Sequence, residues 1–163
     1  MTILVRPLTL EDAPAVAALA AEFADYLRRL GDSGPHALTA EAIRRDGFGP
    51  QPAFAGLLAV AETGAASGAA GSAGYLLYHL GYDADWAARN LHVIDLYVRP
   101  AARRQGAGRA LMAEAARRCR EAGGAYLFWA VYPPNRLAAD FYTRLGARYV
   151  QDLDFMVISP NSL

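Results

Sequence analysis

Hydrophobic and polar positions in the first third of the chain follow the period of a strand and then that of helices. Residues 3–7 alternate apolar with other side chains, which indicates a short strand. Apolar residues then recur with helical spacing as far as Leu30, between Thr9, a suitable cap, and Gly31, a suitable end. A shorter helix is expected over 40–46.

The same periods continue through the rest of the chain. Further strands are expected over residues 53–62, 74–82, 91–98, 125–132 and 148–158. Helices are expected from Gly106 onward and over 136–145, and the small residues 64–74 favour a hairpin loop. The order β-α-α-β-β-β-α-β-α-β predicts an α/β fold, with one domain over 1–163 and a mixed central sheet flanked by helices.

Composition excludes several classes of function. The formal net charge is zero, so the molecule as a whole is not built to bind nucleic acid or an anionic membrane. Every basic residue is Arg, which excludes a lysine Schiff base. Cys119 is the single cysteine, so an intramolecular disulfide is excluded and no metal site is expected. Without a long apolar run or a signal-peptide pattern, we expect a cytoplasmic protein.

The stretch RRQGAG, residues 103–108, lies between an expected strand and an expected helix, where backbone N–H groups and the helix dipole attract phosphate. Gly106 and Gly108 let the backbone come close to a ligand because they carry no Cβ. A P-loop is excluded by the absence of Lys, and a dinucleotide fingerprint lacks its third Gly, which would fall at Leu111. An ordinary turn with a solvated arginine face remains the alternative.

Two motifs resemble the GNAT superfamily of N-acetyltransferases. RRQGAG, after LYVRP, fits the Q/R-x-x-G-x-G/A pattern of the acetyl-CoA pyrophosphate loop, and NRLAADFYTRLGA (135–147) resembles the later Asn…Phe-Tyr…Gly-Ala helix. YHLGYDADW (78–86) and FWAV (128–131) are most similar to the diamine (spermidine/spermine) and thialysine acetyltransferase branch. The resemblance covers 78–147 well and 1–77 only in the order of elements.

The resemblance implies a single GNAT-type domain that is an N-acetyltransferase. It would move an acetyl group from acetyl-CoA to a primary amine of a small polyamine-like or amino-acid-like molecule, by direct attack in a ternary complex. A domain that senses acetyl-CoA without turnover, and an enzyme that acetylates proteins or peptides, are the alternatives. Many relatives are homodimers, so a homodimer is expected, with the last strand available to pair across the interface.

Contacts to acetyl-CoA also follow from the resemblance. Loop amides would hold the pyrophosphate, and the end of strand 91–98 would pair with the pantetheine where it splays from strand 125–132. The expected cofactor-binding residues are Leu96, Tyr97, Val98, Arg103, Arg104, Gln105, Gly106, Ala107, Gly108, Arg109, Asn135 and Ala139.

Tyr142 is the expected general acid for the leaving thiolate. Leu137, Phe141 and Leu145 form the core stripe of their helix, and Tyr142 lies off that stripe, one turn after the small Ala139. In the family that the motifs resemble, the general-acid Tyr stands at the position that matches Tyr142. A Tyr that only packs against its neighbours is the alternative.

The general base has several candidates. Ile94 stands where the diamine branch commonly carries Glu, and Ile cannot take a proton. His92 shares a strand face with Ile94 and could act through a water. Asp95 is expected on the opposite face, where a structural role is favoured and catalysis is the minority alternative. A water chain without a dedicated base is a further option.

Acidic and aromatic residues are the candidates for binding the amine. Asp83, Glu22 and Trp86 are expected in this role, with Asp83 preferred because Tyr82-Asp83 matches a pair in the diamine branch. Plain surface carboxylates are the alternative. Cys119 is expected to be a buried structural thiol rather than a nucleophile.

Overall fold

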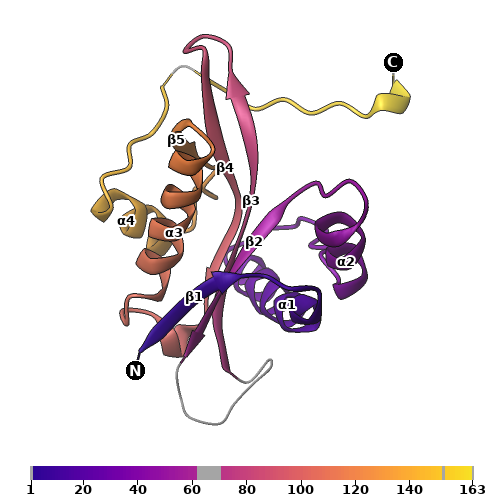
Figure 1. Ribbon diagram of the computed structural model, residues 1–163, viewed down its shortest axis with the longest axis vertical. Helices are drawn as coiled ribbons and strands as arrows, with labels where there is room; N and C mark the ends of the chain where they lie inside the picture. The colour runs from indigo at the N-terminus through magenta and orange to yellow at the C-terminus, as the bar shows by residue number, and fades with distance from the viewer. Residues whose placement is uncertain (1, 62–70, 152, 163) are drawn as a thin grey trace.

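The computed structural model describes residues 2–61, 71–151 and 153–162, and Figure 1 shows one sheet with helices on both faces. The strands are β1 (Ile3–Pro7), β2 (Ala55–Ala61), β3 (Ser72–Asp83), β4 (Ala88–Val98) and β5 (Gly124–Phe128). The α-helices are α1 (Ala13–Arg29), α2 (Ala40–Phe48), α3 (Ala107–Glu121) and α4 (Arg136–Arg144). Short 3₁₀ helices are η1 (Leu10–Asp12), η3 (Pro100–Ala102) and η4 (Pro160–Ser162). The expected loop over 64–74 lies largely outside the described residues.

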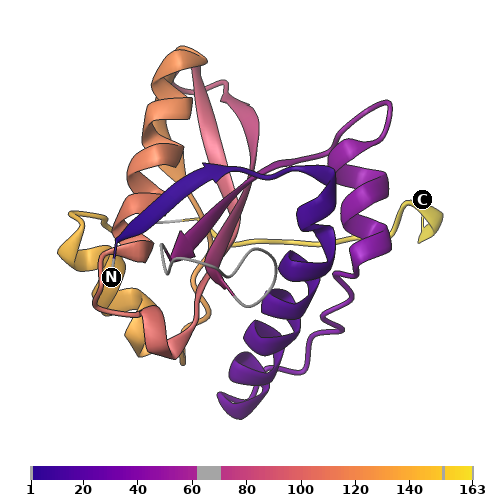
Figure 2. The same ribbon diagram turned by 60° about the horizontal axis from the view of Figure 1, so that its bottom comes forward.

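The five strands lie side by side in sequence order, β1-β2-β3-β4-β5. Neighbours from β1 to β4 are antiparallel, whereas β4 and β5 are parallel, so the sheet is mixed as expected. The parallel pair is joined through α3, the kind of crossover that a parallel connection needs. Helices α1 and α2 cover one face, here called the α1 face, and α3 and α4 cover the other, the α3 face (Figures 1 and 2).

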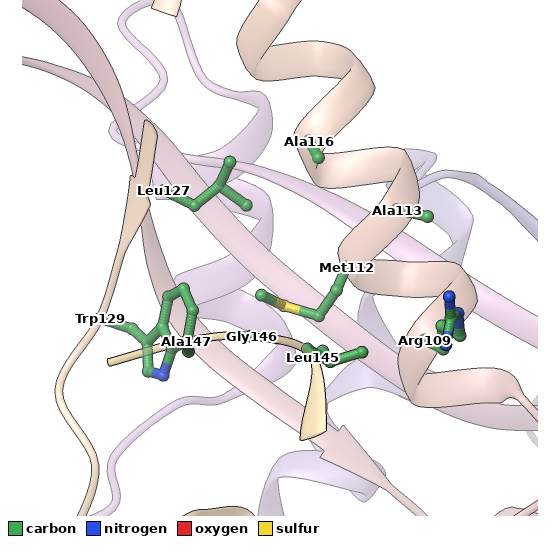
Figure 3. A pocket seen from close by; sticks show the side chains of 9 residues that line it. All are labelled: Arg109, Met112, Ala113, Ala116, Leu127, Trp129, Leu145, Gly146 and Ala147. Carbon is green, nitrogen blue, oxygen red and sulfur yellow. The ribbon is translucent and has the colours of Figure 1, made fainter. Parts of the chain in front are cut away.

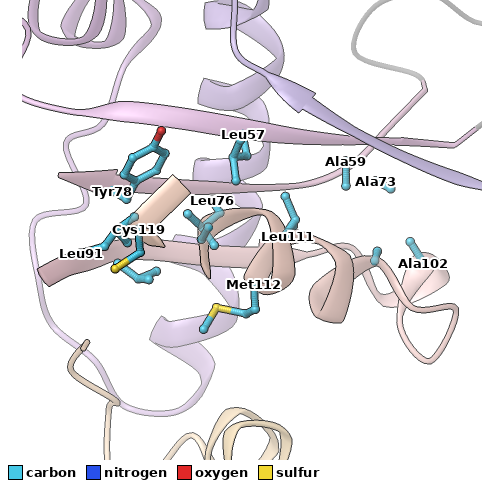
Figure 4. Packing of buried hydrophobic residues seen from close by; sticks show 13 residues of the cluster. Leu57, Ala59, Ala73, Leu76, Tyr78, Leu91, Ala102, Leu111, Met112 and Cys119 are labelled. Carbon is cyan, nitrogen blue, oxygen red and sulfur yellow. The ribbon is translucent and has the colours of Figure 1, made fainter. Parts of the chain in front are cut away.

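Two apolar clusters, one on each face of the sheet, hold the helices in place. On the α3 face, Leu76 and Leu91 of the sheet and Leu111 of α3 are all 0% exposed (Figure 4). Cys119 lies in the same cluster and is 1% exposed, as expected for a structural thiol. On the α1 face, α1 buries Leu19 completely. Burying one such side chain is worth about 1.5–3 kcal/mol, so these contacts fix the helices against the sheet.

Local capping explains where the first helices begin and end. The Thr39 hydroxyl accepts the N–H of Ala42 at 3.1 Å, so α2 starts where the sequence predicts. The N–H of Thr9 donates to Oδ2 of Asp12 at 2.8 Å across η1, which leads into α1. Gly31 follows α1 with a φ of +95°, a left-handed conformation that glycine adopts readily.

Two strands expected near the C-terminus differ from the structure. β5 ends at Phe128 rather than at 132, because pairing with β4 stops there and two prolines, which lack an N–H, follow shortly.

The strand expected over 148–158 is wrong. Its described residues form no strand and run away from the body of the molecule (Figure 1). The side chains of Phe155 and Met156 are 87% and 97% exposed. The apolar pattern of this segment suits a strand, but a strand also needs a neighbour, and none within the described residues pairs with it.

Candidate active site

β4 and β5 lie side by side only over the first half of β4. Their last matched pair is His92 with Phe128, and β4 continues to Val98. Beyond that pair, no strand in the described part of the chain covers the β5-facing edge of β4. Leu96 and Tyr97 lie in this open stretch, whose N–H and C=O groups can bond to an extended ligand. Pairing between the two strands therefore stops part-way along β4, as the resemblance implies, although β5 is shorter than expected.

A β-bulge at Ile94 decides which side chains face α1. Val93 and Asp95 pair with neighbouring residues of β3, so Ile94 is one residue too many in β4. Asp95 pairs with Leu77, which belongs to the cluster on the α1 face. Val93 packs on the α3 face, so the adjacent His92 also points to the α1 face. The expectation that Asp95 faces away from His92 is wrong, because the bulge interrupts the regular alternation.

The splayed strands border a cavity of about 170 Å³ against α1 and α4. It is lined by Phe23, Leu27, Val93, Ile94, Asp95, Leu96, Trp129, Ala130, Val131, Tyr132, Asn135, Ala138 and Tyr142. Of the expected site residues, Tyr142, Asn135 and Leu96 therefore meet in one place. The ring of Trp129 packs against that of Tyr142, with centroids 4.7 Å apart, and so fixes its orientation.

The electrostatics of the cavity keep Tyr142 protonated. Burial, and then the nearby charge of Asp95, raise the pKa of Tyr142 to about 12. Burial also raises the pKa of Asp95, while the hydroxyl of Tyr75, which donates to Oδ2 of Asp95 at 2.9 Å, and the charge of His36 lower it in part. The cavity thus joins a phenol that keeps its proton at neutral pH with a carboxyl group that is less acidic than usual.

Asn135 ties the start of α4 to α1. It is 7% exposed, and its Oδ1 accepts from the hydroxyl of Tyr26 at 2.8 Å and from the N–H of Ala138 at 3.2 Å. The side chain therefore caps α4 as well as lining the cavity.

The glycine turn fits an anion. Gly106 precedes α3 with a φ of +88°, and a Cβ there would meet nothing within 4 Å, so the space beside it is open. A Cβ at Gly108 would lie 3.1 Å from Cζ of Phe141, so this glycine lets α4 pack closely on α3. Since α3 begins at Ala107, its first N–H groups have no partner within the helix and face the same region.

The side chains of the turn divide into inward and outward ones. The guanidinium of Arg103 lies over the rings of Tyr26 and Tyr97, at 5.2 and 5.9 Å from their centroids, and its Nε donates to the carbonyl of Val98 at 2.9 Å. Arg103 thus braces the turn against α1 and β4. Arg104 is exposed and has a φ of +61°.

The residues expected to bind the amine do not line the cavity. Glu22 is held by Arg99, with Nη2 to Oε1 at 2.7 Å, and by the hydroxyl of Tyr97 at 3.4 Å. Asp83 accepts the N–H of Trp86 at 3.1 Å and the hydroxyl of Tyr126. Both carboxylates are therefore engaged in contacts within the chain.

Trp86 and His92 lie on an aromatic row beside the cavity. Trp86 is 70% exposed and meets the ring of Tyr126 edge-on. The imidazole of His92 stacks on Phe128, and its Nδ1 lies 3.0 Å from Nε2 of His79. Burial, and then His79, lower the pKa of His92. His92 directly precedes Val93, which lines the cavity, but His92 itself does not line it.

A larger cavity, of about 370 Å³, lies between α3, β5 and the end of α4 (Figure 3). Met112, Leu127, Trp129 and Leu145 make it largely apolar, and Arg109 is its one ionisable lining residue. The larger cavity has no carboxyl or phenol group in its lining, whereas the smaller one has Asp95 and Tyr142, so size alone does not select the candidate site.

Sequence reasoning missed part of the site. Phe23, Leu27 and Tyr132 line the smaller cavity, and they lie outside the two motifs of the resemblance. The orientation of Asp95 was also missed, because no residue type in β4 signals a bulge at Ile94.

Within the described ranges, no helix is long and apolar enough to cross a membrane. No group of three or more His, Cys, Asp or Glu side chains that could hold a metal ion occurs among the described residues.

Known proteins resemble this chain in sequence. The family model described as "Acetyltransferase (GNAT) family" matches residues 22–147. The thialysine N-epsilon-acetyltransferase of Sus scrofa is 33% identical over 149 residues, which cover 90% of this chain and 85% of the relative. That of Bos taurus is 34% identical over 149 residues, which cover 90% and 84%.

A solved structure shares the fold. The ribosomal-protein-alanine N-acetyltransferase of Brucella melitensis biovar Abortus 2308 matches with a TM-score of 0.73 and 22% identity, over 97% of this chain and 99% of that chain.

Proposed function

Since the chain belongs to the acetyltransferase (GNAT) family and is an N-acetyltransferase, we propose that it acetylates a primary amine of a small amino-acid-like or polyamine-like molecule with acetyl-CoA. The amine attacks directly while both substrates are bound. The observation that carries the proposal is the hydroxyl of Tyr142, which lines a cavity at the open edge of β4.

Acetyl-CoA would lie along the splayed strands and the glycine turn. The backbone N–H groups of 104–109 hold the pyrophosphate, which the open space at Gly106 and the dipole of α3 support. The backbone of 96–98 pairs with the pantetheine, because this edge of β4 has no strand partner in the described chain. Asn135 and Ala139 border the pantetheine from α4.

Acetyl transfer needs a free amine, donors for the carbonyl oxygen and a proton for the departing sulfur. Tyr142 gives the sulfur its proton, which its raised pKa keeps in place until a thiolate forms. A backbone N–H near Tyr97 donates to the carbonyl oxygen. His92 lies outside the cavity lining, which weakens it as the base, and amine binding by Glu22 and Asp83 stays a prediction.

The assembly is part of the proposal. We infer a homodimer, supported by the exposed apolar residues at the C-terminal end and by the free edge of β5. A cytoplasmic location stays a prediction.

Release of CoA from acetyl-CoA by the purified protein tests the proposed function. The panel contains thialysine, lysine, spermidine, putrescine, an aminoglycoside and a short peptide, and Cys119→Ala controls for the protein's own thiol. Saturable release with a small amine is expected. Release with the peptide alone would instead favour a protein acetyltransferase, and tight acetyl-CoA binding without any release would favour a sensing domain.

A further inference from the structure

Asp95 is the one carboxylate among the described residues that line the cavity with Tyr142. The other lining side chains are aliphatic or aromatic, apart from the amide of Asn135 and the phenols. An ammonium group that enters this cavity therefore has a single acidic partner. That partner faces the cavity because of the bulge at Ile94.

The carboxylate is held in place with one oxygen left for a ligand. Tyr75, 0% exposed, donates its hydroxyl to Oδ2 of Asp95 at 2.9 Å. Within the described part of the chain, Oδ1 of Asp95 has no hydrogen-bond partner. Anchoring through one oxygen limits rotation, so the other oxygen presents a fixed acceptor to an incoming N–H.

The groups around Asp95 come from three elements. Tyr75 reaches it from β3, and Tyr142 from α4, while the charge of His36 acts on it from the segment between α1 and α2. None of these is an Arg, so no guanidinium among the described residues neutralises the carboxylate. Partial burial further makes the charged form costly, and a carboxyl group in such a setting takes up a proton more readily than one in water.

We propose that Asp95 binds the ammonium group of the acceptor and takes its proton, so that the base stands one position after Ile94. This assignment rests on the proposed function. It gives the carboxylate a catalytic role in place of the structural one that the sequence favours, and it leaves His92 outside the reaction.

The proton and bond changes balance as follows. The acceptor ammonium gives one proton to Asp95 and becomes a free amine. Its nitrogen forms a bond to the acetyl carbonyl carbon, the carbon–sulfur bond breaks, and Tyr142 protonates the sulfur. The second proton lost by the nitrogen returns to the oxygen of Tyr142 through water. Asp95 then releases its proton to solvent, so each turnover yields the amide, CoA and one proton.

Asp95→Asn is the direct test, because the amide keeps an oxygen for Tyr75 while it removes the charge and the basicity. We expect kcat/KM at neutral pH to fall by about 10²–10⁴-fold, the usual contribution of a general base. The acid limb of the pH profile should disappear with it. Acetyl-CoA affinity, measured by calorimetry, and the thermal midpoint should be unchanged.

Tyr75→Phe provides a second, independent variant. The hydrogen bond from Tyr75 lowers the pKa of Asp95. Loss of this bond should therefore move the acid limb of the pH profile to higher pH, while activity at alkaline pH is kept. A carboxylate with only a structural role would not shift this limb. Asp46→Asn is the matched control, since Asp46 pairs with Arg45 on the surface of α2 and should leave the profile unchanged.

The outcomes separate the two proposals. Suppose that the wild type turns over, that the acid limb of the pH profile persists in Asp95→Asn, and that this limb does not move in Tyr75→Phe. These results would overturn the role of Asp95 and leave the proposed function standing. Failure of the wild type to acetylate any amine would overturn the proposed function, and the role of Asp95 with it.

Discussion

Tyr142 and Asp95 both line the smaller cavity, and both are held toward their protonated forms by their surroundings. Burial is the larger cause in each case. The charge of Asp95 also disfavours ionisation of Tyr142, because two anions in one small cavity repel. At the scale of single residues, the site thus keeps a proton on the phenol and makes the carboxyl group a better proton acceptor.

Replacing Tyr142 by Phe tests the phenol. The change keeps the ring against Trp129 and removes only the hydroxyl, so we expect turnover to fall by about 10²–10⁴-fold, as for loss of a general acid. Acetyl-CoA affinity measured by calorimetry should stay the same. Undiminished turnover in this variant would remove Tyr142 from the mechanism.

Asp12 gives a prediction about stability rather than activity. The hydrogen bond from Arg6 is the largest cause that lowers the pKa of Asp12. The stability from this pair is therefore complete above the unfolded pKa of about 3.9 and is lost as the pH falls through the lowered folded value.

In Asp12→Asn, we expect a loss of about 1 kcal/mol at pH 7, because Arg6 is partly exposed to solvent. The loss should shrink in denaturant unfolding at pH 3. An equal loss at both values of pH would show that the charge of Asp12 does not matter.

At the scale of elements, the turn between β4 and α3 depends on two glycines for different reasons. Position 106 has a left-handed backbone conformation, which favours glycine. Position 108 lies against the ring of Phe141, and glycine leaves space for that ring. The motif pattern marks both residues, but only the structure separates conformation from packing.

Alanine at each position should separate these two needs. In Gly106→Ala, left-handed strain should cost about 1–2 kcal/mol and weaken acetyl-CoA binding, because the turn relaxes. In Gly108→Ala, a gain in helix propensity of about 0.5–1 kcal/mol offsets the small shift of Phe141, so stability should hardly change. Chemical denaturation and calorimetry measure both, and equal losses in the two variants would contradict this division.

How far the sequence predicts the structure also depends on the element. Helical spacing and caps place α1 and α2, since Thr39 and Gly31 act locally. Where β5 ends, and whether residues 148–158 form a strand, depend on which strands pair with each other. Pairing is a long-range property that the periodicity of the sequence does not predict. The core stripe predicted for α4 is wrong in part, because Leu137 is 46% exposed and Tyr142 packs beside Phe141 and Leu145 on the α3 face. The choice of Tyr142 therefore rests on the resemblance. The direction of Asp95 was not predictable from the sequence, because a bulge leaves no mark in residue type.

At the scale of the whole molecule, apolar surface is concentrated at the C-terminal end. Leu153, Phe155 and Val157 are 76%, 87% and 99% exposed, which is unusual for a cluster of large apolar side chains in water. No strand in the described part of the chain pairs with the outer edge of β5, so this edge can offer hydrogen-bonding groups to an added segment. The C-terminal segment of a second copy can bind this edge, and the segment of the first copy can bind the same edge of the second. This reciprocal contact has the symmetry of a closed dimer.

Removing residues 149–163 tests the proposed dimer. Light scattering should give twice the chain mass of 17.5 kDa for the full-length protein and the single mass for the shortened one. The thermal midpoint of the full-length protein should rise with concentration, since association stabilises the folded chain. A full-length protein that stays at the single mass at high concentration would contradict the dimer.

The extra residue in β4 has a consequence for how such enzymes diverge. In a regular strand, a reactive side chain can be relocated only in steps of two, because neighbours face opposite sides of the sheet. The bulge at Ile94 relaxes this parity, so a carboxylate one position further along can face the same side while the strands around it keep their partners. Equivalent reactive groups in two related chains can thus occupy different alignment columns, and they are matched by their place in space.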